Sequence, residues 1–80
     1  MDNIMSQILE ILEGVRPDLD FKNEKKLIDD KLLDSFDIIS IVGEFNETFD
    51  IAINADDLEP YNFNTIEAME ELITKLQEEG

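Results

Sequence analysis

The 80-residue sequence contains no cysteine and no histidine. Without cysteine there is neither a disulfide framework nor a thiol nucleophile. Without histidine, catalytic triads that need an imidazole base and zinc sites built from His and Cys are excluded. Carboxylates are plentiful, but no pair of them is marked as catalytic rather than solvated. We therefore expect no enzyme, and any reactive thiol has to come from a group attached to the chain.

Long apolar runs are also missing. None approaches the roughly 20 residues that a membrane-spanning helix needs, and the first three residues lack the basic and apolar lead of a signal peptide. We expect a cytoplasmic protein without membrane insertion. Residues 1–80 are enough for one small domain, but not for an elaborate enclosed active site.

Positive charge is scarce, since six basic residues stand against 21 acidic ones and the formal net charge is -15. Such a chain repels nucleic acids and anionic membrane surfaces, so its partners should carry basic patches. Five of the six basic residues precede position 32, and from there on Lys75 alone opposes thirteen acids. This asymmetry favours a recognition surface in the second part of the chain over a merely solubilising charge.

Apolar residues at helical spacing predict a first helix over residues 3–14. Asp2 or Asn3 can cap this helix, and Gly14 and Pro17 are expected to end it.

The strongest apolar stripe predicts a central helix over residues 35–49. Its members are Ile38, Ile41, Val42, Phe45 and Phe49. Phe36 and Ile39 lie off this stripe, and in so small a chain an apolar residue away from the core indicates contact with a partner.

The last helix is expected to begin after a cap at Asn64 or Thr65, with Glu67 completing a capping box from Asn64. A single helical turn is expected near residues 54–58, and an irregular turn near residues 60–63. The predicted fold is therefore all-α: a small four-helix bundle, three helices long and one short, with a long first loop.

That first loop covers residues 15–34, which is long for a compact domain. Its apolar residues are expected to plug one end of the bundle, and they are Val15, Leu19, Phe21, Leu27, Ile28, Leu32 and Leu33. The predicted helical core consists of Ile4, Ile8, Ile11, Ile41, Phe45, Phe49, Ile53, Ile66, Met69 and Ile73.

The candidate functional residue is Ser35, where the loop gives way to the central helix in the run Asp34-Ser35-Phe36-Asp37. We expect Ser35 to be the helix N-cap, beside free backbone N–H groups and the positive end of the helix dipole. Helix N-termini bind anions, so this hydroxyl is suited to carry a phosphate ester. The alternative for an isolated Asp-Ser pair is simple capping.

This run, the apolar stripe and residues 44–53 resemble the acyl carrier proteins, and the likeness in helix order and loop placement covers nearly the whole chain. The resemblance implies that Ser35 receives 4'-phosphopantetheine from coenzyme A through a Mg²⁺-dependent phosphopantetheinyl transferase. The thiol of the arm then carries cargo as a thioester. It implies no catalysis by the chain itself and no metal site.

The resemblance also implies a recognition surface for the transferase and for acyl- or aminoacyl-loading enzymes with basic docking surfaces. Asp34 matches the acid that engages the transferase. The apolar contacts would be Phe36 and Ile39, and the acidic face would comprise Asp37, Glu44 and Glu47. A monomeric, free-standing carrier is the expected form.

Three positions depart from the family pattern. Lys31 stands where a glycine is usual, so the turn before Ser35 can differ, and Ser40 and Asn46 replace acids common in fatty-acid carriers. The Gly-Gly lead of peptidyl carrier domains is absent.

Two other functions remain open at this point. One is a carrier for an activated amino acid, such as a D-alanyl carrier. The other, from a different class, is an unmodified acidic interaction module or a calcium-binding protein. Asp18, Asp20 and Glu24 lack the glycine and the spacing of an EF-hand loop, which disfavours calcium.

Overall fold

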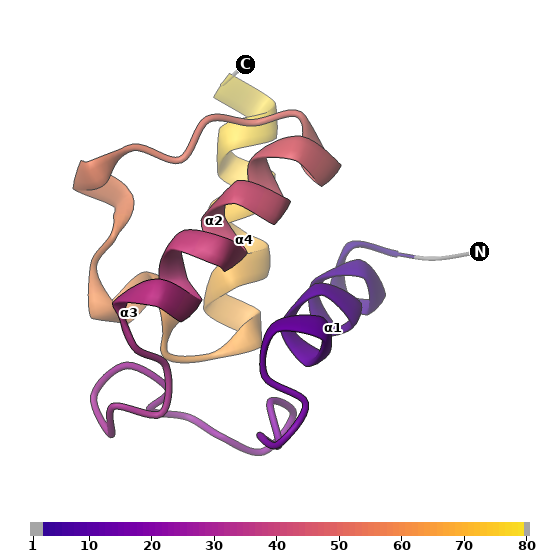
Figure 1. The fold of residues 1–80 in the computed structure, drawn as a ribbon. Helices are drawn as coiled ribbons and strands as arrows, with labels where there is room; N and C mark the ends of the chain where they lie inside the picture. Colours follow the sequence, from indigo (N-terminus) through magenta and orange to yellow (C-terminus); the bar gives the residue numbers. More distant parts are fainter. Residues whose placement is uncertain (1–2, 80) are drawn as a thin grey trace.

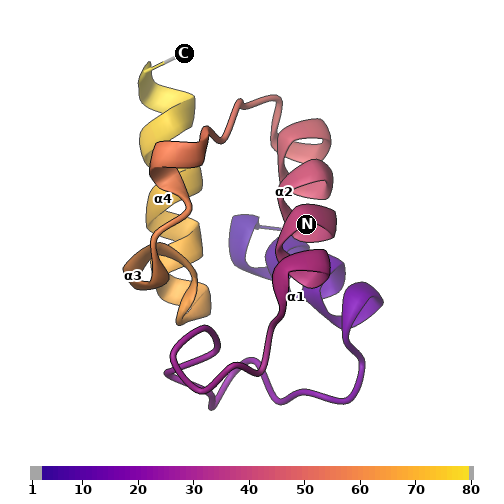
Figure 2. The same cartoon turned by 60° about the vertical axis from the view of Figure 1, so that its left-hand side comes forward.

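Figure 1 shows a computed structural model of the protein, which describes residues 3–79. Over these residues the chain forms three long α-helices, one short α-helix and one 3₁₀ turn, with no strand. The long helices are α1 (Ile4–Val15), α2 (Ser35–Phe49) and α4 (Ile66–Glu79). Helix α1 packs against both α2 and α4, and the view in Figure 2 shows α2 and α4 running alongside each other. The predicted all-α bundle with a long first loop is confirmed.

Helix α1 begins one residue later and ends one residue later than predicted. Asn3 is its N-cap, because the Asn3 side chain accepts the Ser6 N–H at 2.8 Å. The alternative cap, Asp2, lies outside the described residues. Gly14 lies inside the last turn instead of ending the helix, since its φ is not positive. The helix ends at Val15, with Arg16 as its C-cap.

Between α2 and α4 the chain crosses one end of the bundle (Figure 1). The expected single turn is the 3₁₀ turn η1 (Ala55–Asp57). Residues 60–63, expected as an irregular turn, form the short helix α3 (Pro60–Phe63) with Pro60 at its first position. Proline suits that position because the first helical N–H has no partner within the helix.

Asn64 does not cap α4, so the predicted capping box with Glu67 is wrong. Thr65 is the cap, because its Oγ1 accepts the Ala68 N–H at 3.0 Å. The Asn64 side chain instead accepts the N–H groups of Ile28 and Asp29, at 2.9 and 3.0 Å. These bonds compete with capping for the same carboxamide oxygen, and they attach the long loop to the corner between α3 and α4.

The core combines side chains from α1, α2, α3, α4 and the long loop. Its buried members are Ile8, Leu12, Phe21, Leu27, Leu33, Ile41, Phe45, Phe49, Phe63, Ile66, Met69, Leu72 and Ile73. Of the predicted core, Ile4, Ile11 and Ile53 are only partly buried and pack at its margin. The long loop lies at the lower end of the bundle in Figure 1, and its residues Phe21, Leu27 and Leu33 are buried in the core, as expected for a loop that closes that end.

Candidate functional site

The cap of α2 is Asp34, not Ser35 as the sequence had suggested. Asp34 has extended backbone angles (φ -98°, ψ -176°), and its Oδ1 accepts the Asp37 N–H at 2.9 Å. Aspartate caps helices as well as serine does, and here the residue one position earlier takes the role. Ser35 is therefore the first residue within the helix, and its hydroxyl is not needed for capping.

Asp34 and Asp37 form a reciprocal capping box around Ser35. Asp37 Oδ2 accepts the Asp34 N–H at 3.2 Å, in return for the bond that Asp34 accepts from Asp37. The two bonds fix the backbone on both sides of the serine. They leave the Ser35 side chain exposed to solvent.

The backbone around Ser35 suits an anion. The intrahelical ladder of α2 starts with the Ile38 N–H, which donates to the Asp34 carbonyl at 3.0 Å. The N–H groups of Ser35 and Phe36 come before that first bond, at the positive end of the helix dipole. A phosphate ester on the Ser35 oxygen would be stabilised there.

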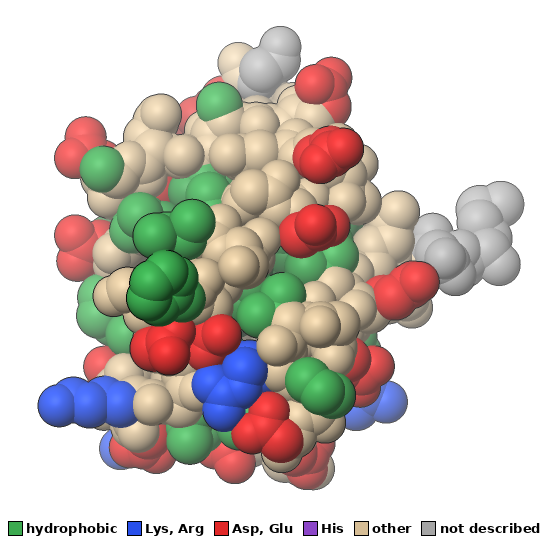
Figure 3. Space-filling view, viewed as in Figure 1, with side chains coloured by type: hydrophobic (Ala, Val, Ile, Leu, Met, Phe, Trp, Pro, Cys, Tyr) green, Lys and Arg blue, Asp and Glu red, His purple; other side chains and the backbone are tan. Residues whose placement is uncertain are grey.

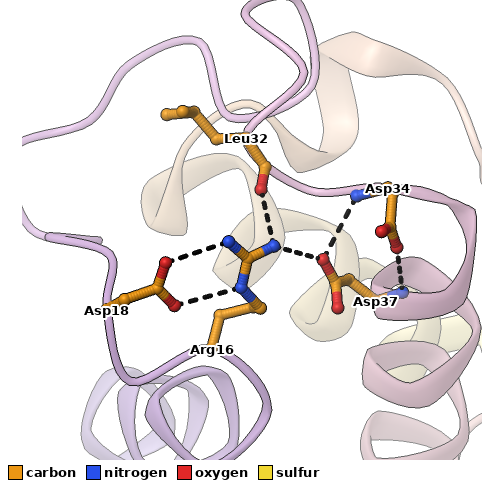
Figure 4. Close-up of polar contacts among 5 residues, drawn as sticks. All are labelled: Arg16, Asp18, Leu32, Asp34 and Asp37. Carbon is orange, nitrogen blue, oxygen red and sulfur yellow. Dashed lines mark hydrogen bonds and ion pairs between the residues drawn. The ribbon is translucent and has the colours of Figure 1, made fainter.

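Arg16 connects this capping box to the rest of the molecule (Figure 4). Its Nη1 donates to Asp37 Oδ2 at 2.7 Å and to the Leu32 carbonyl at 3.0 Å. Its Nε and Nη2 donate to the two oxygens of Asp18, at 3.0 and 2.9 Å. We call Arg16, Asp18, Leu32, Asp34 and Asp37 the Arg16 network.

Charge-assisted hydrogen bonds within the Arg16 network shift two pKa values. The bonds from Arg16 lower the pKa of the Asp18 carboxyl below its ordinary value. The bonds to Asp18 and then Asp37 raise the pKa of the guanidinium. Both groups are therefore held in their charged forms at neutral pH.

Sequence reasoning missed Arg16. One signal was available: Arg16 is the one arginine of a strongly acidic chain, and it directly follows the first helix. A guanidinium can donate in several directions within one plane, which makes it suited to joining carboxylates from separate segments.

The residues expected to contact partners divide into two groups. Phe36 and Ile39 are 81% and 67% exposed, and Figure 3 shows an apolar patch over the start of α2 with acidic side chains beside it. Glu44 and Glu47 are also exposed on α2. The side chain of Asp37 differs from this expectation: it is only 14% exposed and is paired with Arg16.

Asn46, one of the departures from the carrier pattern, has a structural role. Its Oδ1 accepts the Ile53 N–H at 2.9 Å, and its carbonyl accepts the Ile51 N–H at 3.2 Å. These bonds hold the chain that leaves α2 against the last turn of the helix. At the position where the resemblance to fatty-acid carriers leads us to expect an acid, the chain thus has an asparagine that holds the following loop by a hydrogen bond.

Lys31, another departure, has a left-handed backbone with φ 59°. Glycine adopts this conformation without the steric cost that a Cβ atom brings, which agrees with the glycine expected here from the resemblance to carrier proteins. Lys31 thus adopts, before Ser35, a backbone conformation that glycine would adopt more easily.

The carboxylates considered for calcium are not arranged around a common point. Asp18 is bound by Arg16, and Asp20 accepts from Asn23 at 2.6 Å. Within residues 3–79, no group of three or more His, Cys, Asp or Glu side chains has the geometry of a metal site. No helix in this part of the chain is long and apolar enough to cross a membrane.

Residues 3–73 match the family model described as the phosphopantetheine attachment site. The chain belongs to this family. No curated protein and no solved structure matches it. The family carries 4'-phosphopantetheine covalently, as the resemblance to carrier proteins implied. An exposed serine hydroxyl at the start of a long helix, with free backbone N–H groups, fits the phosphate end of that group.

Membership of the family also bears on activity and partners. Phosphopantetheine attachment domains are typically carriers without catalytic activity of their own. They interact with phosphopantetheinyl transferases and with acyl-handling enzymes. The chain is therefore a carrier protein with a phosphopantetheine arm.

Proposed function

We propose that the protein is a free-standing acyl carrier protein whose 4'-phosphopantetheine arm is attached to Ser35. The observation that carries the proposal is the position of Ser35 in the first turn of α2, where its side chain is exposed and does not cap the helix. Asp34 takes the cap and Asp37 closes the box, so the hydroxyl is available to a second protein.

The attachment is a phosphoryl-transfer step at the Ser35 oxygen. The Ser35 hydroxyl oxygen bonds to the phosphorus that bears the pantetheine half of coenzyme A, as the P–O bond of the pyrophosphate breaks. Adenosine 3',5'-bisphosphate leaves and the hydroxyl proton is released. The chain has no histidine or cysteine to activate the serine, so the transferase has to supply the base and the bound Mg²⁺.

Partner recognition is proposed to run through the start and the exposed face of α2. Phe36 and Ile39 provide the apolar contacts, and Asp34, Glu44 and Glu47 meet a basic surface on the partner. Exposed ion pairs contribute at most about 1 kcal/mol each. Their combined field should mainly accelerate encounter.

The attachment site is tested by intact-mass measurement after incubation with coenzyme A, Mg²⁺ and a broad-specificity phosphopantetheinyl transferase. The wild type should gain one phosphopantetheine mass, and Ser35→Ala should gain none while remaining folded. Ser40→Ala is the matched control, because Ser40 is an exposed serine on the same helix. An unmodified wild type with several transferases, or a modified Ser35→Ala, would overturn the proposal.

The cargo is proposed to be an acyl group, with an activated amino acid as the alternative that the resemblance leaves open. Intact mass of the protein purified from its native source distinguishes the two, because the thioester-bound group adds its own mass to the arm. Hydroxylamine treatment, which cleaves thioesters, should remove that additional mass and leave the arm in place.

A further inference from the structure

Arg16 is bonded to three separate parts of the chain around the attachment serine. It follows the end of α1, it donates to Asp18 and to the Leu32 carbonyl within the long loop, and it donates to Asp37 in the first turn of α2. Four hydrogen bonds thus start from one guanidinium (Figure 4). Leu32 lies three residues before Ser35 and Asp37 two residues after it, so Arg16 holds the chain on both sides of the serine.

One oxygen, Asp37 Oδ2, connects Arg16 to the capping box. Asp37 Oδ2 accepts both the Arg16 Nη1 bond at 2.7 Å and the Asp34 N–H bond at 3.2 Å. Asp34 in turn accepts the Asp37 N–H. The orientation of the first turn, which carries Ser35, therefore depends on a chain of bonds from Arg16 through Asp37 to Asp34.

We propose that Arg16 is a positioning residue for the transfer of phosphopantetheine to Ser35, and that Asp37 serves this positioning instead of contacting the transferase directly. The proposal rests on the proposed attachment at Ser35. It separates the acids of α2 by role: Asp37 orients the serine from within the domain, whereas the exposed Glu44 and Glu47 attract the partner.

The alternative role for Arg16 is purely electrostatic, and it predicts the opposite sign. Replacing Arg16 by glutamine makes the net charge more negative, so a basic transferase should associate faster if only the field matters. If Arg16 positions the serine, the same substitution should slow modification despite the stronger attraction. Small misplacements of a reacting atom can lower a rate by up to about a hundredfold.

The test measures kcat and KM for modification of folded variants, by intact mass, at low and at moderate salt. Arg16→Gln should lower kcat/KM by about tenfold, mostly through kcat, and should not flatten the salt dependence. Arg16→Lys should recover part of the loss, because one ammonium can reach Asp37 or the Leu32 carbonyl but not all three partners.

Asp37 offers a sharper comparison because both of its accepted side-chain bonds end on the same oxygen. Asp37→Asn keeps one amide oxygen for these two bonds and removes the charge, whereas Asp37→Ala removes both bonds. Positioning predicts near-wild-type modification for Asp37→Asn and about a tenfold loss for Asp37→Ala. Glu44→Gln and Glu44→Ala form the matched control pair, and they should behave alike because only the charge of Glu44 is expected to matter.

Circular dichroism identifies which variants are folded, and the Asp37 pair decides the question if Arg16→Gln does not fold. Equal losses for Asp37→Asn and Asp37→Ala, with a flattened salt dependence, would make Asp37 a docking acid and overturn the proposal. Modification of Arg16→Gln at or above the wild-type rate would also overturn it. Failure of the wild type to be modified would instead overturn the attachment at Ser35, so the two failures are distinct.

Discussion

Asn64 and Ile28, 36 positions apart in the sequence, are joined by a hydrogen bond of 2.9 Å from the Ile28 N–H to Asn64 Oδ1. Asn64 also accepts the Asp29 N–H, donates to the Asp29 carboxylate at 3.1 Å, and accepts the Leu27 N–H through its carbonyl. Together with the Arg16 network, this residue fixes the long loop that leads to Ser35. The loop is thus attached through Asp18 and Leu32 to Arg16, and through Ile28 and Asp29 to Asn64.

Asn64→Ala should therefore lower the free energy of unfolding by about 1–3 kcal/mol, because two loop N–H groups lose their partner. Chemical denaturation measures the change. Asn23→Ala is the control, since Asn23 makes one exposed bond to Asp20, and it should change the stability by less than about 0.5 kcal/mol. Equal stability of Asn64→Ala and the wild type would show that these bonds do not hold the loop.

Lys31→Gly should stabilise the protein by up to about 1 kcal/mol, because it removes the steric cost of a left-handed residue with a Cβ atom. Thermal or urea unfolding measures the effect. Lys22→Gly makes the same change of charge at an exposed loop position with a negative φ, and it should instead destabilise by about 0.4–1 kcal/mol. A destabilised Lys31→Gly would contradict the backbone conformation at position 31.

Phe45 and Phe36 lie on the same helix but should respond to truncation in opposite ways. Phe45 is fully buried and packs edge-on against Phe49, with ring centroids 5.9 Å apart. Phe45→Ala should cost about 3–5 kcal/mol, a large part of the stability of so small a domain. Phe36→Ala should change the stability by less than about 0.5 kcal/mol. It should nevertheless lower kcat/KM for modification, since Phe36 is proposed to contact the transferase.

The Arg16–Asp18 pair should give a pH-dependent contribution to stability. The pKa of Asp18 is lowered in the folded state, so the pair stabilises the protein above the ordinary carboxyl pKa and the contribution disappears as pH falls through the folded value. Asp18→Asn should be less stable than the wild type at neutral pH, and the difference should vanish in strong acid. Asp20→Asn removes the same charge at a carboxylate that accepts from Asn23 instead of an arginine, and urea unfolding at neutral pH should show a smaller loss of stability for it.

The docking acids can be tested by charge reversal at two exposed positions of α2. Glu44→Lys combined with Glu47→Lys should slow modification by the transferase and flatten its salt dependence, because exposed charges act over about 10 Å at 0.1 M salt. Glu10→Lys combined with Glu13→Lys changes the net charge equally on α1. If the α1 pair had the same effect, net charge and not the α2 surface would govern the encounter.

The sequence by itself determined the three long helices, most of the helical core and the place of Ser35 at the start of α2. These features depend on local signals: apolar spacing that matches the helical period, and capping residues at the helix starts. Even so, neighbouring capping residues could not be ranked locally. Asp34 and Ser35 are both good caps, and only the backbone of the folded chain selects Asp34.

Only the tertiary structure decided which polar side chains bond to residues far away in the sequence instead of capping a helix or lying exposed. Asn64 does not cap α4, because its side-chain oxygen accepts the loop N–H groups of Ile28 and Asp29. Asp37 is bonded to Arg16, although its position in the helix suggested an exposed acid. Such bonds join residues more than twenty positions apart, so no pattern along the sequence contains them. Packing of the loop brings these groups together, and the bonds made by Ile28 and Asp37 then satisfy polar groups that are partly shielded from water.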